Sequence, residues 1–227
     1  MMHKRIVPAQ AALLVSLLAL FASGCGASFA PPATMSGFGA TARGEGVAAV
    51  HGLGTHDGVW QGDVQVPIRT DTDVRVGVVG HQWPGQNKES FTLGQLGLRH
   101  RFSPNDARFL PSVGATLAMG LGGHNRAWGD DVRRPLVVAA AVDLGLSYRA
   151  LPWLQFYGVA RTQYGTGLRD DAEGLGVPPT VWLQAVAGTR LNIGPATVGL
   201  GLSLAQFWNR DDNDDLLGGT VTVGWTF

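Results

Sequence analysis

The sequence predicts an all-β fold: a closed, antiparallel, up-and-down transmembrane β-barrel of about ten strands, with eight strands as the alternative. Three observations support this prediction. From about residue 40 to the end, apolar residues alternate with small or polar residues in one segment after another. Glycine contributes 33 of the 227 residues, whereas charged residues make up only 15% of the chain. The connections between these segments are short and long in turn, as in a barrel with tight turns at one end and loops at the other.

The first 24 residues are expected to form a bacterial export signal peptide. Lys4 and Arg5 make the start of the chain positive, and an apolar run follows over residues 11–22. That run is shorter than the ~20 residues that a membrane-spanning helix needs. Small residues then lead to Cys25, the only cysteine of the chain.

The segment Ala22-Ser23-Gly24-Cys25 resembles the lipobox of bacterial lipoproteins, although that family prefers leucine where this chain has Ala22. The resemblance implies cleavage before Cys25 and lipidation of its thiol. The alternative is ordinary cleavage after Ala30. Both interpretations export the protein from a bacterial cytoplasm. Residues 25–40 are then a periplasmic N-terminal linker, and residues 41–227 form the barrel.

Ten alternating segments are the expected strands. In the clearest one, over 111–123, Val, Ala, Leu, Met and Leu alternate with Gly, Thr, Ala and Gly. Successive side chains of a strand point to opposite faces, so each segment has one apolar face and one small or polar face. Several segments suit the ~9–11 residues that cross a bilayer at a tilt. The expected strands are 41–53, 59–69, 74–82, 91–102, 111–123, 136–149, 153–166, 180–192, 196–208 and 217–227.

The lengths of the connections assign the two ends of this barrel. The longer connections are expected at 83–90, 124–135, 167–179 and 209–216, and only the first connection, over 54–58, departs from the alternation. Barrels of bacterial outer membranes have short periplasmic turns and longer external loops. Ten strands therefore place both termini on the periplasmic side.

The last strand places Val221, Val223, Trp225 and Phe227 on one face. This pattern, with its aromatic last residue, resembles the C-terminal signal of bacterial outer-membrane β-barrels. The resemblance implies insertion by the barrel-assembly machinery, a location in the bacterial outer membrane, and contact with outer-membrane lipid and lipopolysaccharide. Five tryptophans near expected strand ends are consistent with the aromatic girdles of such barrels. They are Trp60, Trp153, Trp182, Trp208 and Trp225.

Ionisable residues lie opposite the apolar faces of the expected strands, where the lumen of the barrel would be. We interpret them as a structural network of polar side chains that fills the lumen. Because arginine outnumbers the acids on this face, a narrow pore with a preference for anions is the alternative. A soluble lipocalin-like lipoprotein would reverse the two faces, but the scarcity of lysine and the aromatic terminus favour the membrane. The proposed network contains Glu45, Asp63, Arg75, Arg99, Asp143, Arg161 and Arg190.

Little in the sequence indicates enzymatic chemistry. His51, His81 and His124 share the inner-face parity near the outer ends of their strands, which leaves a rim-active hydrolase as an alternative. We find no catalytic motif, and we expect no metal and no cofactor. A formal net charge of zero argues against a nucleic-acid partner. The expected role is non-enzymatic, either structural or in surface contacts through the loops at 124–135 and 167–179.

Overall fold

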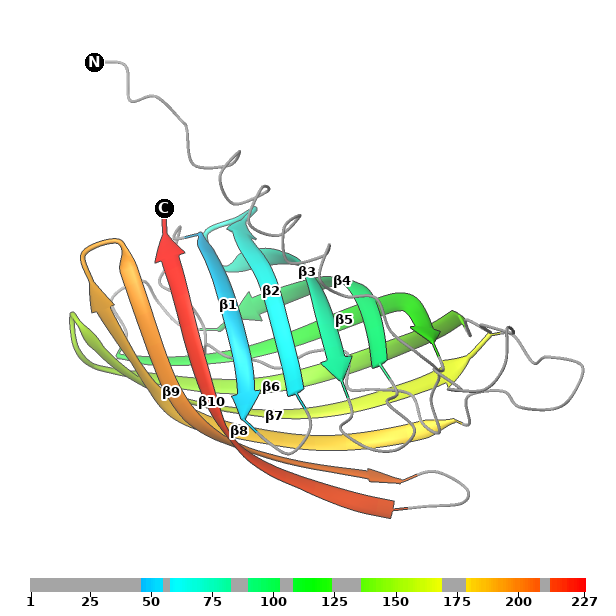
Figure 1. Cartoon of the computed structure of the whole chain (residues 1–227). Helices are drawn as coiled ribbons and strands as arrows, with labels where there is room; N and C mark the ends of the chain where they lie inside the picture. The colour runs from blue at the N-terminus through cyan, green and yellow to red at the C-terminus, as the bar shows by residue number, and fades with distance from the viewer. Residues whose placement is uncertain are drawn as a thin grey trace, which may run out of the picture.

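A computed structural model describes residues 46–54, 58–82, 90–102, 108–123, 136–168, 179–208 and 213–227. These residues form a closed antiparallel barrel of ten strands (Figure 1), in which each strand pairs with the next and β1 pairs with β10. The predicted fold class is therefore confirmed, with ten strands rather than eight. The expected signal peptide, the linker and Cys25 lie outside the described residues. Where the structure describes the chain, no helix is long and apolar enough to span a membrane.

The ten strands follow the predicted order closely. Most of the expected boundaries differ from the observed ones by only one or two residues. The strands are β1 (Val47–Gly54), β2 (Gly58–Pro67), β3 (Thr72–Gln82), β4 (Ser90–Arg101), β5 (Phe109–Gly123), β6 (Leu136–Leu151), β7 (Leu154–Gly167), β8 (Thr180–Ile193), β9 (Ala196–Trp208) and β10 (Asn213–Thr226).

The connections define two ends of the barrel, which we call the turn end and the loop end. The turn end carries the β2–β3, β4–β5, β6–β7 and β8–β9 connections together with the C-terminus. The β8–β9 turn needs Gly194 because its φ is 60°, a backbone conformation that side chains with a Cβ disfavour. The β6–β7 turn follows a shift in the strand register between Arg149 and Leu151.

Closure of the barrel depends on the pairing of β1 with β10. This ladder runs from Val47 opposite Thr226 to Gly54 opposite Gly219. It is extended by two backbone hydrogen bonds between Gly46 and Phe227, each with a nitrogen–oxygen distance of 3.1 Å. Closure pairs the edge strands with each other and removes the free edge that an open sheet would present.

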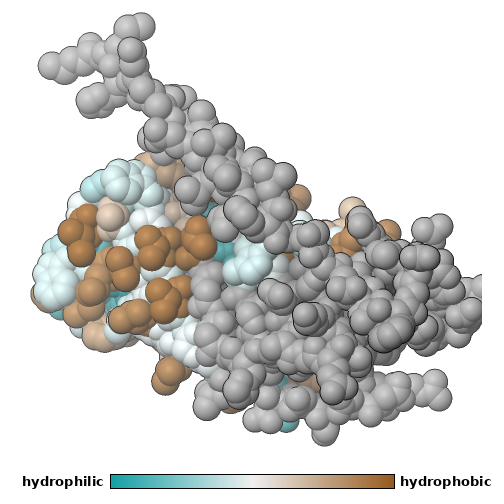
Figure 2. Space-filling view, in the orientation of Figure 1, coloured by the Kyte–Doolittle hydropathy of each residue, from teal (hydrophilic) through white to brown (hydrophobic). Residues whose placement is uncertain are grey.

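The two faces of the strands differ in the way that the sequence predicted. Along β7, Tyr157, Val159 and Arg161 are buried inside the barrel, whereas alternate residues such as Phe156 and Tyr164 are exposed. The outer face is strongly apolar, and Figure 2 shows hydrophobic side chains gathered over the coloured part of one side. The most exposed apolar residues of the strands include Leu117, Leu144, Leu200, Leu202 and Val223.

Two sequence-based expectations differ from the structure. Strand β10 begins at Asn213, so part of the connection expected at 209–216 belongs to the strand. Trp182 was expected in an interfacial girdle, but its side chain is 1% exposed and lies inside the barrel. Its parity along β8 is that of the inward residue Gln184, and this parity decides its direction. Trp153 and Trp225, by contrast, are exposed on the outside at the turn end.

Candidate functional site: the lumen of the barrel

The lumen is filled with polar side chains as well as apolar ones. Eight charged side chains are buried in the described part of the chain, five of them arginines and three of them aspartates. All come from strands and point inward, so the buried charges sum to +2 if every group is ionised. The arginines are Arg75, Arg99, Arg101, Arg161 and Arg190, and the aspartates are Asp63, Asp73 and Asp143.

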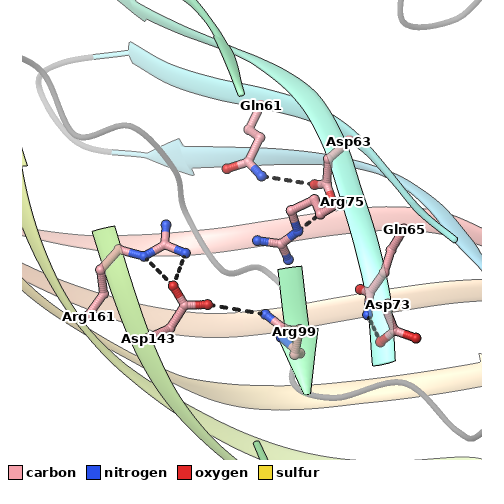
Figure 3. Close-up of polar contacts among 8 residues, drawn as sticks. All are labelled: Gln61, Asp63, Gln65, Asp73, Arg75, Arg99, Asp143 and Arg161. Atoms are coloured by element: carbon pink, nitrogen blue, oxygen red, sulfur yellow. Dashed lines mark hydrogen bonds and ion pairs between the residues drawn. The ribbon is translucent and has the colours of Figure 1, made fainter. Parts of the chain in front are cut away.

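Asp143 on β6 lies between two arginines from different strands. Its Oδ1 atom accepts hydrogen bonds from Arg161 on β7, at 2.6 Å from Nη2 and 3.0 Å from Nε. Its Oδ2 atom is 3.7 Å from Nη2 of Arg99 on β4. Figure 3 shows the three side chains pointing toward one another. A single carboxylate therefore links β4, β6 and β7 across the inside of the barrel.

Asp63 on β2 also uses both of its carboxylate oxygens, one with an arginine and the other with a glutamine. Its Oδ2 atom is 3.1 Å from Nε of Arg75 on β3, and its Oδ1 atom accepts a hydrogen bond from Gln61 at 2.9 Å. Both carboxylate oxygens are thus occupied (Figure 3). A buried charge with both oxygens bonded avoids most of the penalty of an unsatisfied ion.

Asp73 on β3 completes a third cluster at the turn end. Its Oδ1 atom is 2.7 Å from Nη2 of Arg101 on β4, and its Oδ2 atom accepts a hydrogen bond from Gln65 on β2 at 2.6 Å. Asp73 is not among the predicted lumen residues because the expected strand began one residue later, at residue 74. Its parity with Arg75, two residues further along, was the signal that would have identified it.

Toward the loop end, the described lumen contains a group of apolar side chains beside buried polar ones such as Gln61 and Gln163. There, the rings of Trp182 on β8 and Phe207 on β9 are 4.8 Å apart between centroids, and both side chains are buried. Val79, Leu93 and Val137 also point inward in the loop half of their strands and are buried. These five buried residues are apolar and add no charge to this part of the lumen.

Tyr157 lies in the turn half of β7, four residues nearer the turn end than Arg161, and its hydroxyl group faces β8 and β9. Gly188 and Gly201 are paired on those strands, and a Cβ atom on either would lie about 3 Å from the Tyr157 hydroxyl oxygen, at 2.7 Å and 3.1 Å respectively. The two glycines therefore make room for the phenol ring. A side chain at either position would have to displace it.

The predicted site residues fall into three groups. Asp63, Arg75, Arg99, Asp143 and Arg161 come together in the two clusters described above. Arg190 lies apart from them, and its Nε atom donates a hydrogen bond to Asn192 Oδ1 at 2.8 Å. Glu45, like Cys25 and His124, lies outside the described residues.

Two of the three predicted rim histidines, His51 and His81, lie on strands that the structure describes, and these strands are not neighbours. His51 on β1 is opposite Gln61 and Thr222, whereas His81 on β3 is opposite Val59 and Phe91. Strand β2 separates the two histidines. Where residues are described, no group of three or more His, Cys, Asp or Glu side chains is arranged to hold a metal ion.

The C-terminal residues Val221, Val223, Trp225 and Phe227 all lie on the outer face, where each side chain is about half exposed. They share one apolar stripe along β10, and the Phe227 ring lies over Gly46, where a Cβ atom would collide with it. A C-terminal signal for the barrel-assembly machinery would have to lie on a surface such as this one, which is accessible from outside the barrel. Its role in insertion stays a prediction.

No family model matches the chain, and no curated protein matches its sequence. Among solved structures, the chain is similar to the N-terminal β-barrel domain of OprF from Pseudomonas aeruginosa, with 13% sequence identity and a TM-score of 0.44. The match covers 82% of this chain and all of that domain. A likeness of this size assigns no role to any residue.

Proposed function

We propose that this chain is an integral β-barrel protein of the bacterial outer membrane, with a non-enzymatic structural or surface-interaction role. The observation that carries the proposal is the reversal of the usual burial of residues. Leu144 on β6 is 63% exposed, while its neighbour Asp143 is 4% exposed. The same reversal recurs on β3, where Val76 is exposed beside buried Arg75, and on β4, where Leu98 is exposed beside buried Arg99.

This reversal is costly in water and favourable in a bilayer. Leucines on the outside of a soluble barrel would leave a large continuous apolar surface in contact with water. In hydrocarbon, the apolar surface is solvated by lipid, and closure of the ladder pairs the backbone groups of neighbouring strands. A soluble lipocalin-like lipoprotein would need its apolar side chains to converge inside and its ions to face outward.

The filled lumen supports a structural or interaction role rather than a wide channel. Barrels of about eight strands have interiors filled by side chains, whereas water-filled porins have sixteen or more strands. Contacts with other molecules would then be made by the loops at 124–135 and 167–179. The proposal includes export through residues 1–24, insertion by the barrel-assembly machinery, and contact with outer-membrane lipid and lipopolysaccharide.

The test separates the barrel from the lipid anchor. We expect the protein to fractionate with outer membranes, to resist carbonate extraction, and to change its gel mobility after boiling. The Cys25→Ser variant is the informative comparison, because it removes the lipidated residue and leaves the barrel unchanged. Continued membrane retention of this variant is expected, whereas its release as a soluble protein would contradict a transmembrane barrel.

One observation favours a second function, a narrow pore that prefers anions. The described lumen buries five arginines and three aspartates, so a permeating anion would meet an excess of positive charge. Recordings of the purified protein in planar bilayers test this alternative. Small anion-selective steps would support it, and the absence of conductance would leave the structural role. Cation preference would contradict it.

A further inference from the structure

We propose that the turn end of the barrel carries a binding pocket for small soluble molecules with phosphate or carboxylate groups, formed by Arg108, Arg149 and Arg190. The pocket is separate from the three aspartate clusters of the lumen. The proposal goes beyond the role proposed above, because it rests on the positions of these arginines and not on where the barrel resides.

The site is a cavity of about 330 Å³ at the mouth of the lumen. Its lining contains three arginines and, among the described residues, neither an aspartate nor a glutamate. This volume falls at the lower end of the range found for pockets that bind small molecules. A cavity of this size exceeds what a single water molecule or a simple ion requires.

Strand register places two of the arginines in one row. Arg149 on β6 is opposite Gln155 on β7, and Gln155 is opposite Arg190 on β8. Neighbouring strands are ~4.8 Å apart, so the two arginine backbones are separated by roughly 10 Å, with Gln155 between them. Because both arginines line the same cavity, they suit a ligand that carries more than one anionic oxygen group.

Local structure positions each arginine. The amide nitrogen of Arg149 donates a hydrogen bond to the carbonyl oxygen of Arg108 at 2.8 Å, which brings the start of β5 to the end of β6. The register shift directly after Arg149 interrupts the β6–β7 ladder, and such bulges redirect nearby side chains. The hydrogen bond from Arg190 Nε to Asn192 Oδ1 orients the third guanidinium group.

The lining side chains lie on the inner face of the barrel wall, which indicates a soluble ligand. Arg149 has the parity of the buried residue Ser147, and both Gln155 and Arg190 are buried on the inner face. These side chains therefore belong to the lumen side of the wall and not to the apolar outer surface. A ligand would enter from the water at the turn end rather than from the surrounding lipid.

The chemistry of the lining differs from that of the rest of the lumen. Arg75, Arg101 and Arg161 each contact an aspartate, so their charges are neutralised within the protein. The pocket brings three arginines together beside Gln155 and Asn192, and an anion between the arginines reduces their mutual repulsion. Guanidinium groups bind phosphate and carboxylate oxygens through paired hydrogen bonds.

The experiment measures binding of inorganic pyrophosphate to the folded full-length protein in detergent, by isothermal titration calorimetry. We expect saturable binding that weakens about tenfold in Arg149→Gln and in Arg108→Gln, since each removes a charge-assisted hydrogen bond. Arg108 is exposed and Arg149 is half-buried, so both variants should keep the barrel, as a gel-mobility assay can verify.

Arg69→Gln is the matched control, because Arg69 is an exposed arginine in the β2–β3 connection at the same end and does not line the cavity. Its affinity should remain within about twofold of the parent. Equal weakening in all three variants would reduce the effect to general charge and overturn the proposal. So would the absence of saturable pyrophosphate binding to the parent protein.

A second arm distinguishes a soluble ligand from a lipid headgroup. Pyrophosphate binding is compared in vesicles of phosphatidylcholine alone and in vesicles that also contain phosphatidylglycerol. We expect the same affinity in both after the bulk surface charge is screened with salt. Competition by phosphatidylglycerol that disappears in Arg149→Gln would assign the pocket to lipid headgroups and contradict the soluble ligand.

Discussion

From its middle to the turn end, the lumen is held together by paired charges, whereas toward the loop end it contains a cluster of buried apolar side chains. Asp143 with Arg99 and Arg161 represents the first region, and Trp182 with Phe207 represents the second. Both regions lie behind the same apolar outer face. An apolar outer face is therefore compatible with either charged or apolar side chains on the inside of the barrel.

The comparison shows that the two regions stabilise the same barrel in different ways. An apolar cluster tolerates changes of partner, because the gain from burial has no direction. An aspartate with both oxygens occupied requires particular donors at particular positions. We infer that the charged region selects the strand register, while the apolar region contributes packing.

The largest effect is expected in the charged region. Asp143→Ala removes the carboxylate between Arg99 and Arg161 and leaves two buried cations without that partner, which should destabilise the barrel by about 3–5 kcal/mol. Urea unfolding in lipid vesicles, followed by tryptophan fluorescence, measures this change. The double variant Asp143→Ala/Arg161→Ala should cost less than the sum of the two single variants. Strict additivity would show that the pair is not coupled.

The apolar region should respond to truncation by a different mechanism. Trp182→Ala removes a buried indole and leaves a void beside Phe207, which should cost about 3 kcal/mol, at the lower end for such changes. The same unfolding assay applies, and Trp182→Phe is the conservative control. Because no charged group is removed, the loss of unfolding free energy should not depend on the salt concentration. A salt-dependent loss would contradict the distinction between the two regions.

A substitution on the outer face tests whether both regions share one hydrocarbon environment. Leu144 lies midway along β6, directly after Asp143, and points outward. Leu144→Arg should destabilise the barrel by about 2–4 kcal/mol in lipid vesicles if this position is at the bilayer midplane. Leu144→Met should be nearly neutral. An arginine tolerated there without loss would show that lipid does not surround this face.

The close packing of Tyr157 against β8 and β9 offers a smaller and more local test. A Cβ atom at Gly188 would collide with the Leu200 carbonyl and lie 2.7 Å from the Tyr157 hydroxyl, whereas one at Gly158 would lie 3.9 Å from the nearest atom. Gly188→Ala should therefore cost about 1–3 kcal/mol through overpacking, while Gly158→Ala should be tolerated. Equal unfolding midpoints for the two variants would contradict this account of Tyr157.

The smallest effect concerns a partly exposed carboxylate outside the strands. Thr72 Oγ1 donates a hydrogen bond to Asp71 Oδ1 at 3.1 Å, and this bond lowers the pKa of Asp71 from its ordinary value. A lowered folded-state pKa contributes stability above the unfolded pKa, and this contribution is lost as the pH falls through the folded value. Thr72→Val should raise the pKa of Asp71, as an NMR titration would show. An unchanged pKa would exclude the hydrogen bond as its cause.

Much of this organisation could be predicted because a strand has a period of two. The alternation in the sequence predicted the ten strands and the apolar outer face, and it assigned Asp143 and Arg161 to the same side of the wall. Where parity was set aside, the prediction failed. Trp182 was assigned by its distance from a strand end, although its parity with Gln184 already pointed it inward.

The sequence by itself determined which side chains of each strand share a face, because that grouping depends only on local geometry along the strand. Tertiary structure decided which arginine meets which aspartate and which arginines share a cavity. Arg99 reaches Asp143 from another strand, and Arg149 aligns with Arg190 through Gln155. Both outcomes depend on how far each strand is shifted against its neighbours when the barrel closes, and no local pattern encodes that shift.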